Sequence, residues 1–447
     1  MEESLERIEE LLQERKYTKL RSELTEMNPA DIALLFEELP DSVLPLIFRL
    51  LPKELAAETF VEMEHDSQEL LIHGFSDSEL RDVVDELYVD DAVDIVEEMP
   101  ANVVRRILAN TSPGTRNIIN EILKYPEDSA GSIMTVEYVS LRAHMTAEEA
   151  ILRIRRTGVD KETIYTCYVT TSERKLIGIV SVKDLLLADE EARIADIMDD
   201  NPIFVHTLDG REDVANKFIK YSFIAMPVVD EEMRLVGIVT VDDAIDVLQE
   251  EATEDMKKMS AINPTNKPYL KTGVFEIVRA RAPWLMFLMV SAAFTGTILN
   301  IFQDSLSAVP ALIMFIPMLM GTGGNSGGQA TVTIVRSLSL GDVDLSDIWK
   351  IIWKEMRVAF ICGVLLAAVN FGKILLIDNV DVFVALSVSL TLIAVVFFAK
   401  VVGCTLPLVA KKLGFDPAVM SSPFISTIVD AMSLLVYCAI SKSILGI

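Results

Sequence analysis

The pattern of hydrophobic residues changes twice along the chain. In residues 1 to 126, apolar residues recur at spacings of three and four, as in IALLFEELP and LPLIFRLLP, which is the spacing of amphipathic helices. Leu-Pro and Met-Pro pairs end these segments, because proline does not continue a helix. The pattern predicts an all-α superhelical domain of short helices with a mainly structural role.

The second pattern, from residue 127 to 248, is an internal repeat. The segment LIGIVSVKDLLL at 176–187 is matched by LVGIVTVDDAID at 235–246, and an Ile-Met pair precedes each copy. Each copy predicts a β-branched strand, a turn and a helix, so this region is an α+β domain. It resembles a tandem CBS-domain pair, a regulatory module that often binds adenine nucleotides in the cleft between its repeats.

Two pairs of residues in the repeat bear on nucleotide binding. Ser181 with Asp184, and Thr240 with Asp243, match the Ser/Thr-x-x-Asp positions that hold ribose and phosphate in nucleotide-binding CBS pairs. A Ser, Thr or Asp before a helix is also an ordinary N-cap. Whether an adenine nucleotide such as ATP binds here therefore stays open at this point.

The third pattern fills residues 283 to 447 and predicts an all-α membrane domain. The stretches at 284–302 and 305–335 run 19 and 31 residues without a charge, against the roughly 20 residues that cross a hydrocarbon core. Five transmembrane helices are expected, at 284–302, 305–335, 358–377, 382–410 and 417–441. Residues 249 to 282 connect this domain to the repeat.

Basic residues lie on one side of these spans. Lys and Arg precede the first span and separate the second from the third and the fourth from the fifth, whereas the opposite connections contain neither. Because cytoplasmic connections carry the excess of basic residues, we expect a multi-pass protein of the cell membrane. Its N-terminal domains would be cytoplasmic and its C-terminus would lie outside.

Charge separates the two halves in the same way. The chain has 67 acidic and 40 basic residues, a formal charge of −27, and residues 1 to 282 contain 58 of the acidic and 31 of the basic ones. The whole excess is therefore in the part expected to be cytoplasmic. It argues against nucleic acid as a partner, because affinity for phosphate backbones needs clustered Lys and Arg, and it favours cations.

A glycine cluster marks the second expected span. The run GTGGNSGGQA at 321–330 contains five glycines, which are costly inside helices and need a reason. One interpretation is close helix packing through GxxxG pairs. The other is a broken helix lining an aqueous path, in which Asn325 and Gln329 supply side-chain oxygens. The two interpretations are compatible.

Asp430 lies near the middle of the last expected span. An acidic side chain there costs roughly 2.5–3.5 kcal/mol on insertion scales and usually marks an ion path or a proton relay. A purely structural role would need a basic partner, and the nearest candidates, Lys373 and Lys400, are expected at span ends, where they can reach the interface. Asp416 precedes Pro417 and suits a helix N-cap, with a role at a pore mouth as the second interpretation.

The ligands available in this region suit a hard cation. No histidine occurs after residue 206, and the spans contain no paired cysteines. Carboxylate, amide, hydroxyl and carbonyl oxygens remain, and Mg²⁺ prefers such oxygens while keeping many of its waters.

At this point the chain resembles the MgtE family of magnesium channels over nearly its whole length. The resemblance rests on DSAGSIMT at 128–135, on the GTGGNSGGQA run and on the spacing of Asp416, Pro423 and Asp430. It implies "plug" helices at 249–282 and a homodimer in the lipid bilayer, with a pore on the two-fold axis.

The resemblance also implies pore residues for hydrated Mg²⁺, namely Asp430 with Asn325 and Asp416. The sequence departs from many members at Gly328 and from some at Ser422, where those members carry Asn. We therefore expect ion discrimination to differ in detail.

Acidic residues in the cytoplasmic part suggest how the pore could close. Two carboxylates about 6 Å apart repel by roughly 3 kcal/mol at an effective dielectric constant of about 20. Family members bind Mg²⁺ at corresponding positions, which gives an expected sensor of Asp90, Asp91, Asp94, Glu212, Asp243, Asp246, Glu250, Glu251, Glu254 and Asp255. We hypothesise that cytoplasmic Mg²⁺ bridges these residues and closes the pore; a solvated acidic face is the alternative.

The expected function is therefore magnesium uptake through a Mg²⁺-gated channel. A proton- or sodium-coupled divalent cation exporter is the alternative, because it would also use a carboxylate in mid-span. An enzyme is not expected, because no nucleophile with a base and no second carboxylate accompanies Asp430 in the spans.

Overall fold

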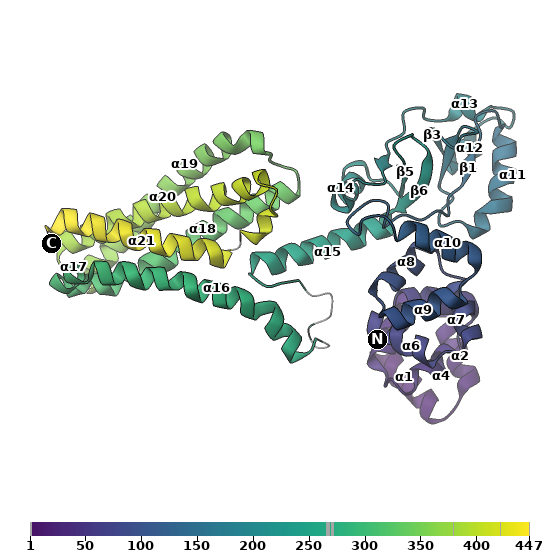
Figure 1. Ribbon diagram of the computed structural model, residues 1–447, viewed down its shortest axis with the longest axis horizontal. Coiled ribbons are helices and arrows are strands. Elements are labelled where there is room, and N and C mark those ends of the chain that lie inside the picture. Colours follow the sequence, from purple (N-terminus) through teal and green to yellow (C-terminus); the bar gives the residue numbers. More distant parts are fainter. Residues whose placement is uncertain (1, 265–268, 270–271, 379, 421, 447) are drawn as a thin grey trace. The chain divides into compact units, whose positions relative to one another are not determined.

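The computed structural model describes residues 2–264, 269, 272–378, 380–420 and 422–446 (Figure 1). The chain divides into two compact units, Met1–Leu248 and Gln249–Ile447. Residues 265–268, 270 and 271 of the expected connecting segment lie outside the described residues.

The first part of the first unit is helical, as predicted. Its helices are α1 (Glu2–Gln13), α2 (Tyr17–Thr25), α3 (Pro29–Glu38), α4 (Leu44–Phe48), α5 (Lys53–Val61), α6 (His65–Gly74), α7 (Asp77–Val84), α8 (Val89–Glu98), α9 (Ala101–Asn110) and α10 (Pro113–Ile122). Helices α3 and α8 end at Leu39 and Met99, which are extended because a proline follows each. The Leu-Pro and Met-Pro stops therefore act as the sequence indicates.

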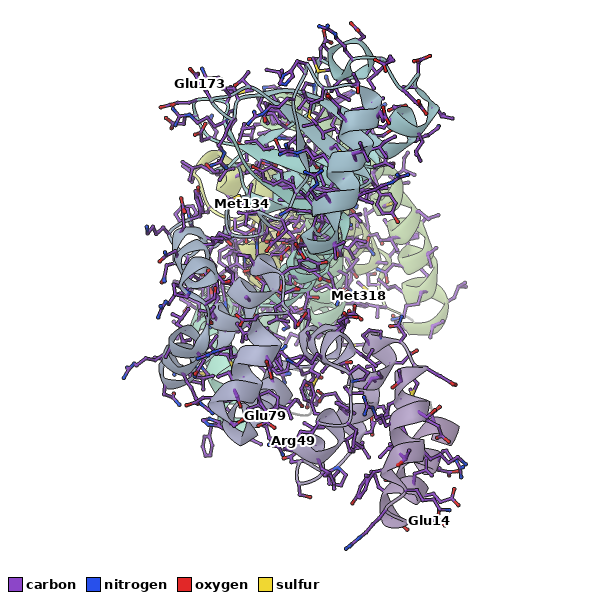
Figure 2. The ribbon with its side chains drawn as sticks, turned by 90° about the vertical axis from the view of Figure 1, so that its right-hand side faces the viewer. Glu14, Arg49, Glu79, Met134, Glu173 and Met318 are labelled. Atoms are coloured by element: carbon purple, nitrogen blue, oxygen red, sulfur yellow. The ribbon has the colours of Figure 1, made fainter. Side chains whose placement is uncertain are left out.

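Aromatic packing and ion pairs join successive helices of this part. Phe48, Phe60 and Phe75 are buried, and their ring centroids are 5.3–6.3 Å apart. Arg49, which ends α4, donates to Glu79 of α7 at 2.6 Å (Figure 2). Ile95 and Val96 of α8, the helix that carries three of the expected sensor residues, belong to the same buried core as these Phe residues.

Two small sheets follow, one from each repeat. The strands are β1 (Ser140–Leu141), β2 (Thr166–Thr170), β3 (Leu176–Ser181), β4 (Val205–His206), β5 (Ala225–Val229) and β6 (Leu235–Thr240). The order is β1-β2-β3 in one sheet and β4-β5-β6 in the other, with the first pair parallel and the second antiparallel. The helices are α11 (Ala147–Thr157), η1 (Gly158–Asp160), α12 (Val182–Leu187), α13 (Ile194–Ile197), α14 (Arg211–Tyr221) and the start of α15 (Val241–Met259).

The methionine of each Ile-Met pair packs against the other repeat. Met134 precedes the first repeat but packs on Gly237 of the second, where a Cβ would lie 2.9 Å from the Met134 sulfur. Met198 packs in the same way on Gly178 of the first repeat, with 2.8 Å between the sulfur and a Cβ placed there. Each repeat therefore needs a glycine at this strand position, because the other repeat's segment crosses it.

The second unit is helical. Its elements after α15 are α16 (Val274–Ile301), α17 (Gln303–Ala308), η2 (Pro310–Phe315), α18 (Ile316–Ser339), η3 (Leu345–Asp347), α19 (Ile348–Lys373), the π-helical turn η4 (Ile374–Asp378), α20 (Val382–Lys412), η5 (Pro417–Val419) and α21 (Ser422–Leu445). Helix α20 packs against α18, α19 and α21, and α21 also packs against α16 and α18 (Figure 1).

Within the described residues, four helical segments are long and apolar enough to cross a membrane: Val274–Ile301, Leu345–Asp378, Val382–Lys412 and Ser422–Leu445. The second expected span, 305–335, is divided, because its first part forms α17 and η2 and the rest lies in α18. The 24 residues of α18 are also long enough but carry the glycines and polar side chains that lower its mean hydropathy. The third expected span begins about three turns earlier than predicted, because α19 already contains Lys350, Lys354 and Glu355.

Candidate metal sites

An acidic cluster gathers around the N-terminus of α8 in the first unit. Asp90 is only 6% exposed, and its Oδ1 is buried without a hydrogen-bond partner among the described residues. Burial raises the pKa of Asp90 well above its usual range, and repulsion from Asp243 and Asp91 raises it further. A buried carboxylate that faces other carboxylates is stabilised when a proton or a cation neutralises it.

The pKa values of Asp91 and Asp243, the other expected sensor residues in the cluster, are also raised. Burial, followed by repulsion from Asp242, raises the pKa of Asp91 to about 6. Burial and the charge of Asp242 raise that of Asp243 to about 7, although Thr240 donates hydrogen bonds that oppose the shift. The structure therefore brings Asp90, Asp91 and Asp243 of the expected sensor together.

Two further carboxylates belong to this cluster and were missed by the sequence reasoning. Burial, then repulsion from Asp91, Asp242 and Asp243, raises the pKa of Glu162 to about 8, and its Oε2 is buried without a hydrogen-bond partner in the described structure. Glu137 accepts a hydrogen bond from the Val89 N–H at the start of α8, at 3.4 Å. Neither glutamate lies in an acidic run, so no local signal in the sequence marks it.

Among the remaining expected sensor residues, Asp246 is linked to the cluster, because burial and then the charge of Asp242 raise its pKa. Asp94 and Asp246 are exposed on α8 and α15, and Glu212 lies in the first turn of α14. Glu250, Glu251, Glu254 and Asp255 belong to the part of α15 in the second unit. Among the residues that the structure describes, no three or more His, Cys, Asp or Glu side chains surround one metal position.

Glu254 and Asp416 are instead joined by a lysine. Lys258 lies 2.6 Å from Glu254 Oε1, one turn earlier on α15, and donates to Asp416 Oδ2, also at 2.6 Å. Burial lowers the pKa of Lys258, but the hydrogen bonds to Asp416 and Glu254 outweigh burial and leave it raised. Asp416 Oδ1 accepts from the Ala418 N–H at 2.8 Å, which confirms the predicted N-cap.

The two Ser/Thr-x-x-Asp pairs form helix caps. Ser181 Oγ accepts from the Asp184 N–H at 3.1 Å and donates to Asp184 Oδ2 at 2.6 Å, at the start of α12. At the start of α15, the N–H and the hydroxyl of Thr240 both donate to Asp243 Oδ2. The Ser181 pair faces solvent more openly, whereas Asp243 is shared with the acidic cluster.

In the second unit, α18 is continuous through its glycine cluster, so the prediction of a broken helix is wrong. The glycines serve close packing instead. A Cβ on Gly323 would lie 2.7 Å from Val395 and 2.8 Å from Val429, and one on Gly403 would lie 2.3 Å from the Gly327 carbonyl oxygen. The helix keeps its backbone hydrogen bonds, and neighbouring helices approach where side chains are missing.

A polar stripe on α21 faces the glycine side of α18. It consists of Ser422, Ser426 and Asp430, which are four residues apart and half-buried. A Cβ on Gly328 would lie 2.5 Å from Ser422 Oγ, and one on Gly324 would lie 3.0 Å from Ser426 Oγ. The two positions that depart from the MgtE pattern, Gly328 and Ser422, are therefore direct neighbours.

Asn325 lies on a different face of α18 from the packed glycines. It is exposed, together with Gly321 and Gln329, which are four residues before and after it. Lys400, which was expected at a span end with its charge at the interface, has a charged partner within the second unit. Its side chain is 9% exposed and lies 3.5 Å from Glu355 of α19.

Comparisons with known proteins cover the whole chain. Residues 27–128 match the family model of the MgtE intracellular N domain, residues 130–191 and 194–250 match CBS domains, and residues 316–440 match MgtE, described as a divalent cation transporter. A magnesium transporter MgtE of Thermus thermophilus is 38% identical over 100% of this chain and 99% of its own length. The chain belongs to the MgtE family.

Other MgtE proteins agree with this assignment. A magnesium transporter MgtE of Bacillus subtilis is 32% identical over 99% of the chain and 97% of its own length. The solved cytosolic domain of a Mg²⁺ channel MgtE in complex with ATP is 39% identical, covers 54% of the chain and 98% of its own, and superposes with a TM-score of 0.52. The solved soluble part of a magnesium transporter is 32% identical, covers 56% of this chain and 99% of its own, and superposes with a TM-score of 0.53.

Proposed function

We propose that this MgtE protein carries Mg²⁺ into the cell through a path lined by α18 and α21. The supporting observation is the stripe of Ser422, Ser426 and Asp430 on α21, because hydroxyls and a carboxylate are costly in a membrane unless they face water or an ion. Sparse oxygen ligands suit an ion that keeps its hydration shell. Two full-length relatives are named magnesium transporters.

The exposed face of α18 supports a homodimer. Asn325 and Gln329 are exposed in one copy of the chain, and polar side chains at this position in a membrane helix turn toward a partner helix or a water-filled path. A second copy related by a two-fold axis would place the two faces opposite one another. We propose that the path runs along this axis, with Asn325 and Asp430 along it and Asp416 near its cytoplasmic mouth.

We further propose that the path closes when cytoplasmic Mg²⁺ binds the acidic sensor. The cluster of Asp90, Asp91 and Asp243 supports this proposal, because burial and mutual repulsion raise the pKa values of its carboxylates. A divalent cation would relieve that repulsion and favour the compact arrangement of the first unit. Glu137 and Glu162 join the residues that would hold it.

The Lys258 bridge supports a role for α15 as the closing element. It joins α15 to η5, which leads into α21 and Asp430. When Mg²⁺ occupies the sensor, α15 would be held with its end against the last span. When Mg²⁺ falls, repulsion within the sensor would release α15. In the proposed membrane orientation, residues 1–248 lie in the cytoplasm and the C-terminus lies outside.

An adenine nucleotide is proposed at the CBS pair. A solved MgtE cytosolic domain that is 39% identical was crystallised with ATP. In this chain the Ser181–Asp184 pair is the more accessible of the two caps, and we propose that it takes the ribose and phosphate groups. Retention of ATP by an Asp184→Asn variant at the affinity of the unsubstituted chain would contradict this assignment.

Flux into proteoliposomes tests the main proposal. Asp430→Asn is expected to abolish Mg²⁺ entry, whereas Asp304→Asn in α17, away from the stripe, leaves it intact. Wild-type entry through Asp430→Asn would refute the path. Flux that required an imposed proton or sodium gradient would favour the coupled exporter instead.

A further inference from the structure

A second pair of charges is buried inside the membrane unit, on helices α19 and α20. Lys400 Nζ lies 3.5 Å from Glu355 Oε2, and the two side chains are 9% and 15% exposed. Glu355 Oε2 is buried and accepts no hydrogen bond among the described residues. The two charges therefore neutralise each other without the hydrogen bond that would make their burial favourable.

Stability alone does not explain such a pair. Removing two charges from water is costly, and replacing a buried ion pair with apolar side chains of similar volume is often neutral or stabilising. A pair that is buried but incompletely hydrogen-bonded contributes little to stability, so we expect its role to lie in the relative position of the two helices that carry it. Charge neutralisation requires that the two side chains stay adjacent, which ties the rotation of α20 to α19.

Helix α20 is in turn joined tightly to α18 beside Lys400. The Ala399 carbonyl oxygen lies 3.2 Å from the Cβ position of Gly327, and the Gly403 Cβ position lies 2.3 Å from the Gly327 carbonyl oxygen. Thr331 Oγ1 lies 3.0 Å from the carbonyl oxygens of both Gly327 and Gly403. The backbones of α18 and α20 lie directly against each other at this crossing, so a rotation of α20 must displace α18.

We propose that Glu355 and Lys400 are positioning residues for the ion path. The pair fixes the rotation of α20 relative to α19. Because Gly403 of α20 lies against Gly327 of α18, the pair also fixes α18 at a point two residues from Asn325. This inference rests on the proposed path along α18. Its consequence is that the charges of Glu355 and Lys400 control ion discrimination although neither residue lies on the polar stripe.

Replacement of both charges tests this proposal without leaving one buried alone. The double variant Glu355→Met with Lys400→Met is expected to fold with an unchanged or higher Tm. Its ratio of Mg²⁺ to Ca²⁺ flux, or its half-saturating Mg²⁺ concentration, should change by about threefold to tenfold. The reversed pair, Glu355→Lys with Lys400→Glu, should stay within about twofold of the unsubstituted channel.

A matched control is the pair Lys373–Asp378, which lies 2.7 Å apart with the lysine 46% exposed. Lys373→Met with Asp378→Asn should alter neither flux nor discrimination. If the double Met variant folds and conducts like the unsubstituted channel, the pair has no positioning role; a reversed pair that folds and changes discrimination as strongly as the double Met variant would equally overturn the proposal. Wild-type flux in Asp430→Asn would instead refute the path itself.

Discussion

The crossing of α18 and α20 gives the sharpest stability prediction. In Gly403→Ala the new Cβ would lie 2.3 Å from the Gly327 carbonyl oxygen. An ordinary carbon–oxygen contact is about 3.3 Å, so the helices must separate by about 1 Å. Backbone atoms form the obstacle, and a change of rotamer cannot relieve it.

The cost follows from this geometry. Overpacking of a tight interface costs about 1–3 kcal/mol, and loss of the Thr331 hydrogen bond to Gly403 adds about 0.6 kcal/mol. Alanine is more favourable than glycine inside a helix, and this difference offsets the cost by up to about 1 kcal/mol. The net destabilisation is about 2 kcal/mol, which corresponds to a fall in Tm of about 4–8 °C for a unit of this size.

The assay compares Gly403→Ala with Gly296→Ala in detergent. Gly296 is the matched control, because it lies inside α16 and a Cβ there meets nothing within 4 Å. Thermal unfolding should show the loss of Tm only in Gly403→Ala, and Mg²⁺ flux should fall in that variant alone. Equal Tm and flux in the two variants would show that the backbone contact is not tight in the membrane.

Three further predictions concern the sensor and its link to the path. Asp243→Asn combined with Asp246→Asn should leave the channel open at high internal Mg²⁺, and unchanged closure in flux assays would contradict the sensor. In the absence of Mg²⁺, the compact form of the first unit should be favoured most below about pH 4 and lost progressively as pH rises from about 4 to 8, because its acids have raised pKa values and bind protons more tightly when compact; protease sensitivity of the full chain that does not change over this range would refute this. Lys258→Met should raise the internal Mg²⁺ needed for closure, whereas Lys257→Met, its neighbour on α15, should not; equal responses of the two variants would exclude the bridge to Asp416.

Local patterns predicted the elements and many of their ends. The proline stops after Leu39 and Met99, the cap at Asp416 and the caps at Ser181 and Thr240 depend on residues within four positions of one another. Such signals can be recognised in a single sequence. The order of the three regions was also predictable, because each has its own hydrophobic period.

Contacts between distant segments were not predictable in this way. Lys400 was expected to reach the interface, but Glu355, 45 residues earlier, lies beside it once α19 starts ahead of its apolar stretch. Glu162 joins Asp90 only because the repeat folds against α8. The glycine run indicated both close packing and a broken helix. The choice in favour of packing depends on contacts with Val395, Val429 and Gly403, which are distant in the sequence.

The central claim is that Asp430 lies on the path of Mg²⁺. Its most direct test is Mg²⁺ entry into proteoliposomes containing Asp430→Asn, with Asp304→Asn as control, at low internal Mg²⁺ and without a proton or sodium gradient. We expect entry to be lost in Asp430→Asn and retained in Asp304→Asn. Equal entry in both variants, with both proteins folded, would contradict the account.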